Sequence, residues 1–293
     1  SFANNRYGPY DPPTISVLGG IKKVVSPGTK VLYALGADFV DPGWPETEVM
    51  PEPASRAEQI LVDEARDAAK TADAIVVAVG ESDLMVGESR SRTSLDLPAR
   101  QLDLVKAMVE SGKPVVVVLV NGRALTINWI AAHVPAAIEA MFPGEFGGQA
   151  IAEALFGDYN PGGKLSFTVP KSVGQLPMNF PTKPGAQAAE ERGGPNNKPT
   201  LVNGVLYPFG HGLSYTSFRY DRLSVTPTTQ KAGGTVRVSV DVTNTGTQQG
   251  DEVVQLYLQD VVSSVTTYDQ VLRGFARIAL RPGDTRTVTF DLK

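Results

Sequence analysis

The sequence predicts an α/β domain with a mainly parallel sheet, followed by an antiparallel β-sandwich. Residues 1–180 alternate helical repeats with continuous apolar runs, which are typical of strands buried on both faces of a parallel sheet. Residues 219–293 alternate apolar and polar side chains, which is typical of half-buried antiparallel strands. Residues 181–204 are polar and rich in Pro, Gly and Asn, and we expect residues 181–218 to form a linker or functional loop packed on the first domain.

The elements of the first domain follow from periodicity and from helix-end signals. Ser55 and Glu58 form a capping-box signature before an apolar repeat, and Gly112 and Gly157 each follow a helical pattern at the position of a C-terminal stop. Helices are expected at residues 55–72, 99–112, 124–134 and 148–157, and buried strands at residues 30–37, 73–79, 113–120 and 136–142.

The second domain shows strict alternation in residues 233–246, where valines 236, 238, 240 and 242 share one face. Three further short strands are expected at residues 252–260, 270–280 and 285–292, with a clear turn at 281–284. This pattern predicts a sandwich of the immunoglobulin or fibronectin type. Because the chain carries about five or six such strands and a sandwich of this type usually has about seven, and because it opens in a loop, both ends are expected to be truncated.

Composition excludes several classes of function. A net charge of −4 and a pI near 5.3 argue against a nucleic-acid partner. No apolar run approaches the roughly 18 residues that would span a membrane, so no membrane span is expected. The absence of cysteine excludes thiolate catalysis, and the two histidines lie far apart, so a His-rich metal site is not expected. Catalysis by this chain is expected to need no metal and no cofactor.

The segment Gly80–Pro98, GESDLMVGESRSRTSLDLP, is the main candidate site. It directly follows the apolar strand 73–79 and combines glycines, carboxylates, two arginines and five hydroxyl side chains. In open α/β sheets, ligands bind at the carboxyl ends of strands. The segment, here called the acidic loop, therefore predicts a binding edge with a candidate catalytic carboxylate.

Four motifs in order resemble family 3 of the glycoside hydrolases. They lie at residues 79–105, 117–125, 142–177 and 206–218, and the C-terminal stretch from residue 235 resembles the fibronectin-III-like module of that family. The resemblance covers nearly the whole chain and corresponds to the C-terminal half of a β-glucosidase or β-xylosidase. It implies a (β/α)8 barrel domain, in the same polypeptide or in a second chain, that carries the nucleophilic aspartate. It also implies a β-linked glucoside or xyloside substrate, with the N-acetylglucosaminidase branch less favoured, and a periplasmic or secreted location.

Retaining hydrolysis needs one carboxylate as nucleophile and a second group that protonates the leaving oxygen and then activates water. The resemblance assigns this acid/base role to Glu88, the glutamate of the GESRSR segment. Glu81 and Asp83 are competing candidates, although Glu81 lies so close to the strand that it is expected to brace the loop. Met85 is a candidate substrate contact that could instead anchor the loop. Arg92 is likewise a candidate substrate contact, or the ion-pair partner of Asp83 or Glu81.

Other features have plainer interpretations. Asn121–Arg123 reads as a turn, and Pro143–Gly148 as a strand-to-helix turn rather than a phosphate cradle, because it lacks the lysine of a P-loop. His133 and His211 are interpreted as structural. Two other functions stay open: a non-catalytic pair of modules that binds carbohydrate or protein, and a flavodoxin-like nucleotide binder, which the absence of a phosphate loop disfavours.

Overall fold

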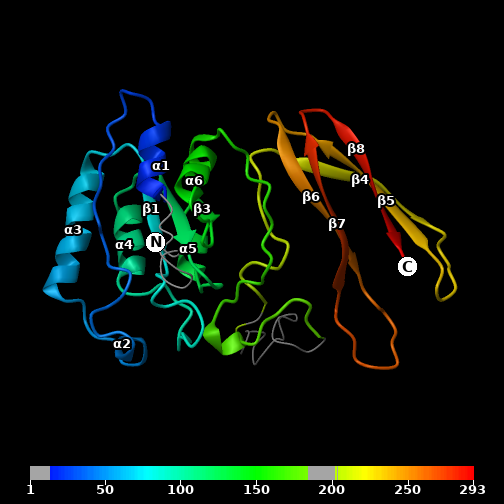
Figure 1. The fold of residues 1–293 in the computed structure, drawn as a ribbon, viewed down its shortest axis with the longest axis horizontal. Coiled ribbons are helices and arrows are strands. Elements are labelled where there is room, and N and C mark those ends of the chain that lie inside the picture. The colour runs from blue at the N-terminus through cyan, green and yellow to red at the C-terminus, as the bar shows by residue number, and fades with distance from the viewer. Residues whose placement is uncertain (1–13, 184–201, 203) are drawn as a thin grey trace, which may run out of the picture. The chain divides into compact units, whose positions relative to one another are not determined.

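The computed structural model describes residues 14–183, 202 and 204–293 (Figure 1). The chain divides into two compact units. The first comprises Ser1–Phe156 with Pro170–Leu176, and the second Gly157–Val169 with Pro177–Lys293. Most of the polar part of the predicted linker 181–218 lies outside the described residues. The predicted boundaries of the linker stay a prediction.

The first unit has a parallel sheet with helices, as the sequence predicts. Its strands, in the spatial order β1-β2-β3, are β1 (Ile75–Gly80), β2 (Val115–Val120) and β3 (Ala136–Glu139). Its helices are α1 (Val17–Val24), α2 (Glu46–Val49), α3 (Arg56–Lys70), α4 (Gln101–Glu110), α5 (Asn128–His133) and α6 (Gly147–Phe156), with a 3-10 turn η1 (Val173–Gln175). Helix α3 packs on α4, α4 packs on β1 and β2, and α1 packs on α6. The core includes Val77, Val105 and Val117, all buried.

The strand register brings the polar residues of the first unit to one edge. Gly80 pairs with Val120, and one residue earlier along the sheet Leu119 pairs with Glu139. The carboxyl ends of all three strands therefore lie at the same edge. The acidic loop leaves β1 at this edge, and the turn that begins at Asn121 leaves β2 there.

The helix predictions hold where the end signals are strong. Ser55 and Glu58 form both hydrogen bonds of the capping box at the start of α3. Helix α5 begins four residues later than the predicted helix 124–134 does. Helices α1 and α2 were not predicted, although Ser16 caps α1 by accepting a hydrogen bond from the Gly19 amide.

The strand predicted at residues 30–37 is wrong. The structure has no strand in that segment, and the side chains of Leu32, Tyr33 and Leu35 are exposed. A strand needs a neighbour that accepts and donates its backbone hydrogen bonds, and the described sheet contains only β1, β2 and β3. An apolar run of this length does not by itself show whether a pairing partner exists.

The second unit is an antiparallel sandwich of five strands within the described residues. One sheet has the order β4 (Phe218–Thr226), β5 (Val236–Asn244), β8 (Thr285–Leu292), and the other pairs β6 (Gly250–Leu258) with β7 (Val271–Leu280). Its core joins both sheets through Val242, Val254, Ile278, Leu280 and Val288. The alternation predicted for β5 therefore does place apolar side chains between the sheets.

Candidate functional site

The start of the acidic loop is fixed by the backbone of β1 and by α4. Gly80 has φ +144°, and a Cβ at this position would overlap the Val120 carbonyl oxygen. The buried Gln101 side chain accepts a hydrogen bond from the Gly80 amide at 2.6 Å and donates one to the Gly80 carbonyl at 2.9 Å. Helix α4 thus holds the point at which the chain leaves the sheet.

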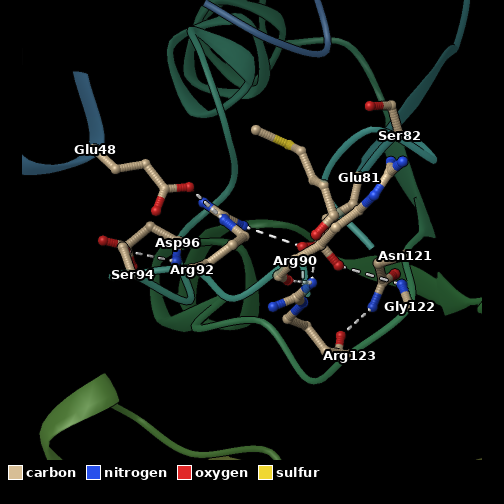
Figure 2. Close-up of polar contacts among 12 residues, drawn as sticks. Glu48, Glu81, Ser82, Arg90, Arg92, Ser94, Asp96, Asn121, Gly122 and Arg123 are labelled. Atoms are coloured by element: carbon tan, nitrogen blue, oxygen red, sulfur yellow. Dashed lines mark hydrogen bonds and ion pairs between the residues drawn. The ribbon is translucent and has the colours of Figure 1, made fainter. Parts of the chain in front are cut away.

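Glu81 is a buried anchor at the base of the acidic loop. Its side chain is 0% exposed, and its Oε1 lies 3.0 Å from Arg123 Nε and 3.3 Å from Arg92 Nη1. Its Oε2 accepts a hydrogen bond from the Gly122 amide at 3.2 Å. Glu81 therefore braces the loop from below, and Figure 2 shows its contacts with both arginines.

Arg92 lies between two glutamates. Its side chain is 2% exposed, and besides Glu81 it contacts Glu48 of α2, where Nε lies 2.5 Å from Oε1. Burial acts to raise the pKa of Glu48, but the hydrogen bonds from Arg92 and from the Thr93 backbone outweigh it and leave that pKa lowered. Of the two expectations for Arg92, the ion pair with Glu81 is observed, and the substrate contact stays a prediction.

Arg123 joins the turn after β2 to the acidic loop. Its Nη2 donates to the Met85 carbonyl oxygen at 2.5 Å and to the Arg90 carbonyl oxygen at 3.3 Å. Met85 is 1% exposed, so its side chain anchors the loop, and its proposed contact with substrate stays a prediction. The segment Asn121–Arg123 is a turn, as expected, and it also supports the loop.

Glu88 lies at the exposed tip of the acidic loop. The tip is the turn Gly87–Arg90, closed by a hydrogen bond from the Arg90 amide to the Gly87 carbonyl at 3.2 Å. Gly87 and Ser89 have positive φ values of 134° and 61°. Arg90 donates from its side chain to the Asp83 carbonyl oxygen. Within the part of the chain that the structure describes, the Glu88 carboxylate has no hydrogen bond or ion pair.

Glu139, at the end of β3, is a second titratable group at this edge. Its Oε1 accepts a hydrogen bond from the Met141 amide at 3.1 Å, and its Oε2 one from Asn121 Nδ2 at 3.5 Å. Burial raises the pKa of Glu139 to about 7. Because Asn121 Nδ2 also donates to the Arg123 carbonyl at 2.7 Å, Glu139 is linked to the turn that supports the loop.

Sequence reasoning missed three residues of this site: Glu48, Gln101 and Glu139. Glu48 lies 44 residues before Arg92, and nothing in the local sequence connects the two. Gln101 looks like an ordinary first residue of a helix. Glu139 lies within the strand predicted at residues 136–142, but only the observed strand end and the pairing with β2 bring it to the edge that carries the acidic loop.

The remaining sequence candidates have structural surroundings. Pro143–Gly148 forms the turn into α6, where the backbone of Gly148 approaches the Ser16 carbonyl. His133 stacks on Trp129 with ring centroids 4.3 Å apart. His211 stacks on Tyr207 at 4.8 Å, and burial, with the nearby Lys164, lowers its pKa. The structural interpretation of both histidines agrees with these contacts.

Among residues 14–183, 202 and 204–293, no group of three or more His, Asp or Glu side chains is arranged to hold a metal ion. The helices of that same part of the chain are all too short or too polar to cross a bilayer.

Comparison with protein-family models gives two matches. Residues 4–215 match the glycosyl hydrolase family 3 C-terminal domain, and residues 252–293 match the fibronectin type III-like domain. The first match contains the whole acidic loop and all of its described supports.

Curated relatives and solved structures agree with these matches. A β-xylosidase of Formosa agariphila is 42% identical over 98% of this chain, and a periplasmic β-glucosidase of Salmonella typhimurium is 42% identical over 95%. The solved β-glucosidase of Erythrobacter marinus has a TM-score of 0.82 at 35% identity over 95% of this chain. A mutant β-glucosidase of Listeria innocua in complex with laminaribiose has a TM-score of 0.79 at 30% identity over 96%. The chain spans only 37%, 38%, 38% and 36% of these four proteins, respectively.

Proposed function

We propose a role for this chain within a larger enzyme, starting from the fact that it belongs to glycoside hydrolase family 3. The chain supplies Glu88 as the general acid/base of a retaining exo-β-glycosidase. The nucleophilic aspartate comes from a (β/α)8 barrel domain, in the longer polypeptide or in a second chain. The preferred substrate is a β-linked glucoside, with a xyloside next, and the location is periplasmic or secreted. The name of the Salmonella relative gives a periplasmic location for that protein.

The observation that carries the proposal is the contrast in surroundings between the carboxylates of the acidic loop. Glu81 is enclosed and paired with two arginines, so it has no free face for a substrate. Glu88 is exposed on a turn whose two limbs are held by Arg123 and Arg92. The Glu88 carboxylate has no partner among the described residues, and the backbone that carries it is held in place. These two properties suit a residue that acts on a substrate bound by another domain.

The chemistry then follows the two steps of retaining hydrolysis. Glu88 in its protonated form gives its proton to the leaving glycosidic oxygen while the barrel carboxylate attacks the anomeric carbon. The Glu88 carboxylate next takes a proton from a water molecule while the water oxygen attacks the anomeric carbon, which breaks the bond to the barrel carboxylate and releases the sugar. Met85 and Arg92 are proposed to lie beside the leaving-group subsite.

The test restores the absent part of the enzyme. The matching segment of the Salmonella β-glucosidase is replaced by this chain, and the chimera is assayed on a nitrophenyl and a dinitrophenyl β-glucoside and on the corresponding xylosides. Glu88→Ala should lower kcat/KM about 10²–10⁴-fold for the poorer leaving group, because general acid catalysis is typically worth that much. Dinitrophenolate needs no proton, so its release should be far less affected, and azide should rescue turnover by replacing water in the second step.

Asp83→Ala is the matched control, because Asp83 is another exposed carboxylate of the same loop. It should leave both substrates near the parent rate. If Glu88→Ala behaves like the control, Glu88 is not the acid/base. If the parent chimera binds laminaribiose but hydrolyses no glycoside, the alternative of a non-catalytic carbohydrate-binding pair of modules is favoured.

A further inference from the structure

Glu48 receives hydrogen bonds from four donors. Oε1 accepts from Arg92 Nε at 2.5 Å and from Trp44 Nε1 at 3.2 Å. Oε2 accepts from the Thr93 amide at 2.9 Å and from the Thr93 hydroxyl at 3.0 Å. Three of these donors belong to the descending limb of the acidic loop (residues 91–98), just after the turn that carries Glu88. Figure 2 shows the contact between Glu48 and Arg92. Helix α2 therefore holds this limb through a single carboxylate.

The two limbs of the loop have different main attachments, although Arg123 also donates to the Arg90 carbonyl at the end of the turn and Glu81 pairs with both Arg123 and Arg92. On the ascending limb (residues 80–86), Arg123, from the turn after β2, donates a hydrogen bond to the Met85 carbonyl oxygen. On the descending limb, Glu48 and Glu81 enclose Arg92 from two sides. Between these two attachments lies the turn with Glu88 at its tip.

The network contains two glutamates, Glu48 and Glu81, and two arginines, Arg92 and Arg123, so it carries no net charge. Buried ion pairs gain attraction but lose hydration, and the two effects largely offset each other. The contribution of such a chain of charges therefore lies mainly in its fixed geometry. Here the geometry sets the backbone position of residues 92 and 93, which lie a few residues from Glu88.

We propose that Glu48 is a positioning residue for the general acid/base, acting on Glu88 through Arg92 and Thr93. This inference rests on the proposed role of Glu88. Misplacement of a reacting group by about 1 Å can cost on the order of 10²-fold in rate, so a residue that fixes the limb of the loop is expected to affect proton transfer.

Glutamine cannot replace Glu48 in this arrangement. Both carboxylate oxygens face N–H donors, Arg92 and Trp44 on one side and the Thr93 amide on the other. An amide has one oxygen and one NH₂ group, so in either orientation it turns a donor towards a donor. Glu48→Gln thus keeps the size of the side chain and releases one side of the attachment.

The experiment measures how the leaving group changes the effect of Glu48→Gln in the same chimera. For the nitrophenyl β-glucoside we expect kcat to fall about 10- to 100-fold, with a change in KM of less than about threefold. For the dinitrophenyl β-glucoside at saturating azide, where neither step needs Glu88, we expect a loss of less than about threefold. The control Glu46→Gln changes an exposed glutamate two positions earlier in the same helix and should alter neither rate.

A double substitution separates positioning from general destabilisation. In a Glu88→Ala background, Glu48→Gln should have no further leaving-group effect, because the group that it positions is absent. Equal losses on both substrates, or an undiminished selective loss in the Glu88→Ala background, would overturn this inference alone. An inactive parent chimera would overturn the proposed function, and the positioning role with it.

A milder variant covers the case in which Glu48→Gln does not fold. Thr93→Val removes only the hydroxyl donor to Glu48, at an exposed position, and retains the amide donor. It should give a smaller, leaving-group-dependent loss, and Thr93→Ser should restore the parent rate. Equal rates for the valine and serine variants would count against the role of Glu48.

Discussion

The base and the tip of the acidic loop each carry a glutamate, and the surroundings of the two carboxylates are opposite. At the base, Glu81 has a fully buried carboxylate held by Arg92, Arg123 and a backbone amide. Seven residues later, at the tip, Glu88 is exposed, with no hydrogen bond or ion pair to any described residue. The loop thus concentrates its fixed interactions at the base and leaves a carboxylate available at the tip.

Neither arginine of the acidic loop forms an ion pair with Glu88 in the described structure. Arg92 is occupied by Glu48 and Glu81, and Arg90 donates to the Asp83 carbonyl. A cation paired with a carboxyl group favours its ionised form, which opposes the role of a general acid. The base therefore holds the loop, and its ion pairs engage Arg92 with Glu48 and Glu81 rather than with the proposed acid.

The largest effect is expected when the base is broken. Glu81→Ala leaves the buried Arg92 with one partner instead of two and removes the acceptor of the Gly122 amide. The first unit should therefore lose about 3–5 kcal/mol of stability, the scale measured for breaking a buried pair. Glu88→Ala should change stability by less than about 0.5 kcal/mol, as surface substitutions usually do.

Urea unfolding followed by tryptophan fluorescence measures both variants, because Trp44 and Trp129, the only tryptophans of the chain, belong to the first unit. Equal loss of stability in the two variants would contradict the distinction between base and tip.

The contacts that are local in sequence could be predicted, and those that depend on tertiary packing could not. The strand before the loop, the strand after α4 and the capping box of α3 were predictable, because periodicity and end signals act locally. The pairing of Arg92 with Glu81 was one of two stated options, since both lie in one loop. Glu48 could not be found, because its contact with Arg92 spans 44 residues and depends on where α2 packs. The false strand at 30–37 has the same cause, since the pairing partner of a strand is a tertiary property.

A smaller effect is expected from pH at the edge beside the base. Burial raises the pKa of Glu139 to about 7 from the ordinary value of 4.5, so the folded chain holds a proton that the unfolded chain has lost between those two values. The contribution of Glu139 to stability is therefore present below about pH 4.5 and is lost as pH rises to about 7, by up to about 3 kcal/mol.

In Glu139→Gln the side chain at position 139 is neutral at all pH values. The stability difference between this variant and the parent chain, measured from pH 4.5 to 8 by urea unfolding, should shift steadily in favour of the variant. A difference that does not change over this range would mean that Glu139 is ionised in the folded chain throughout.

The smallest effect is expected from a steric change between the base and the ascending limb. A Cβ at Gly122 would overlap Val86 Cγ1 and lie 2.6 Å from Phe142 Cε2, so Gly122→Ala must push the loop or the ring aside. Overpacking of this kind typically costs about 1–3 kcal/mol. Gly28→Ala is the control, because Gly28 has no positive φ and nothing lies within 4 Å of an added Cβ. If Gly122→Ala and this control have the same free energy of unfolding in urea, Val86 and the ascending limb can move aside without a cost in stability. Only the Glu48–Arg92–Glu81 side of the loop would then be rigid.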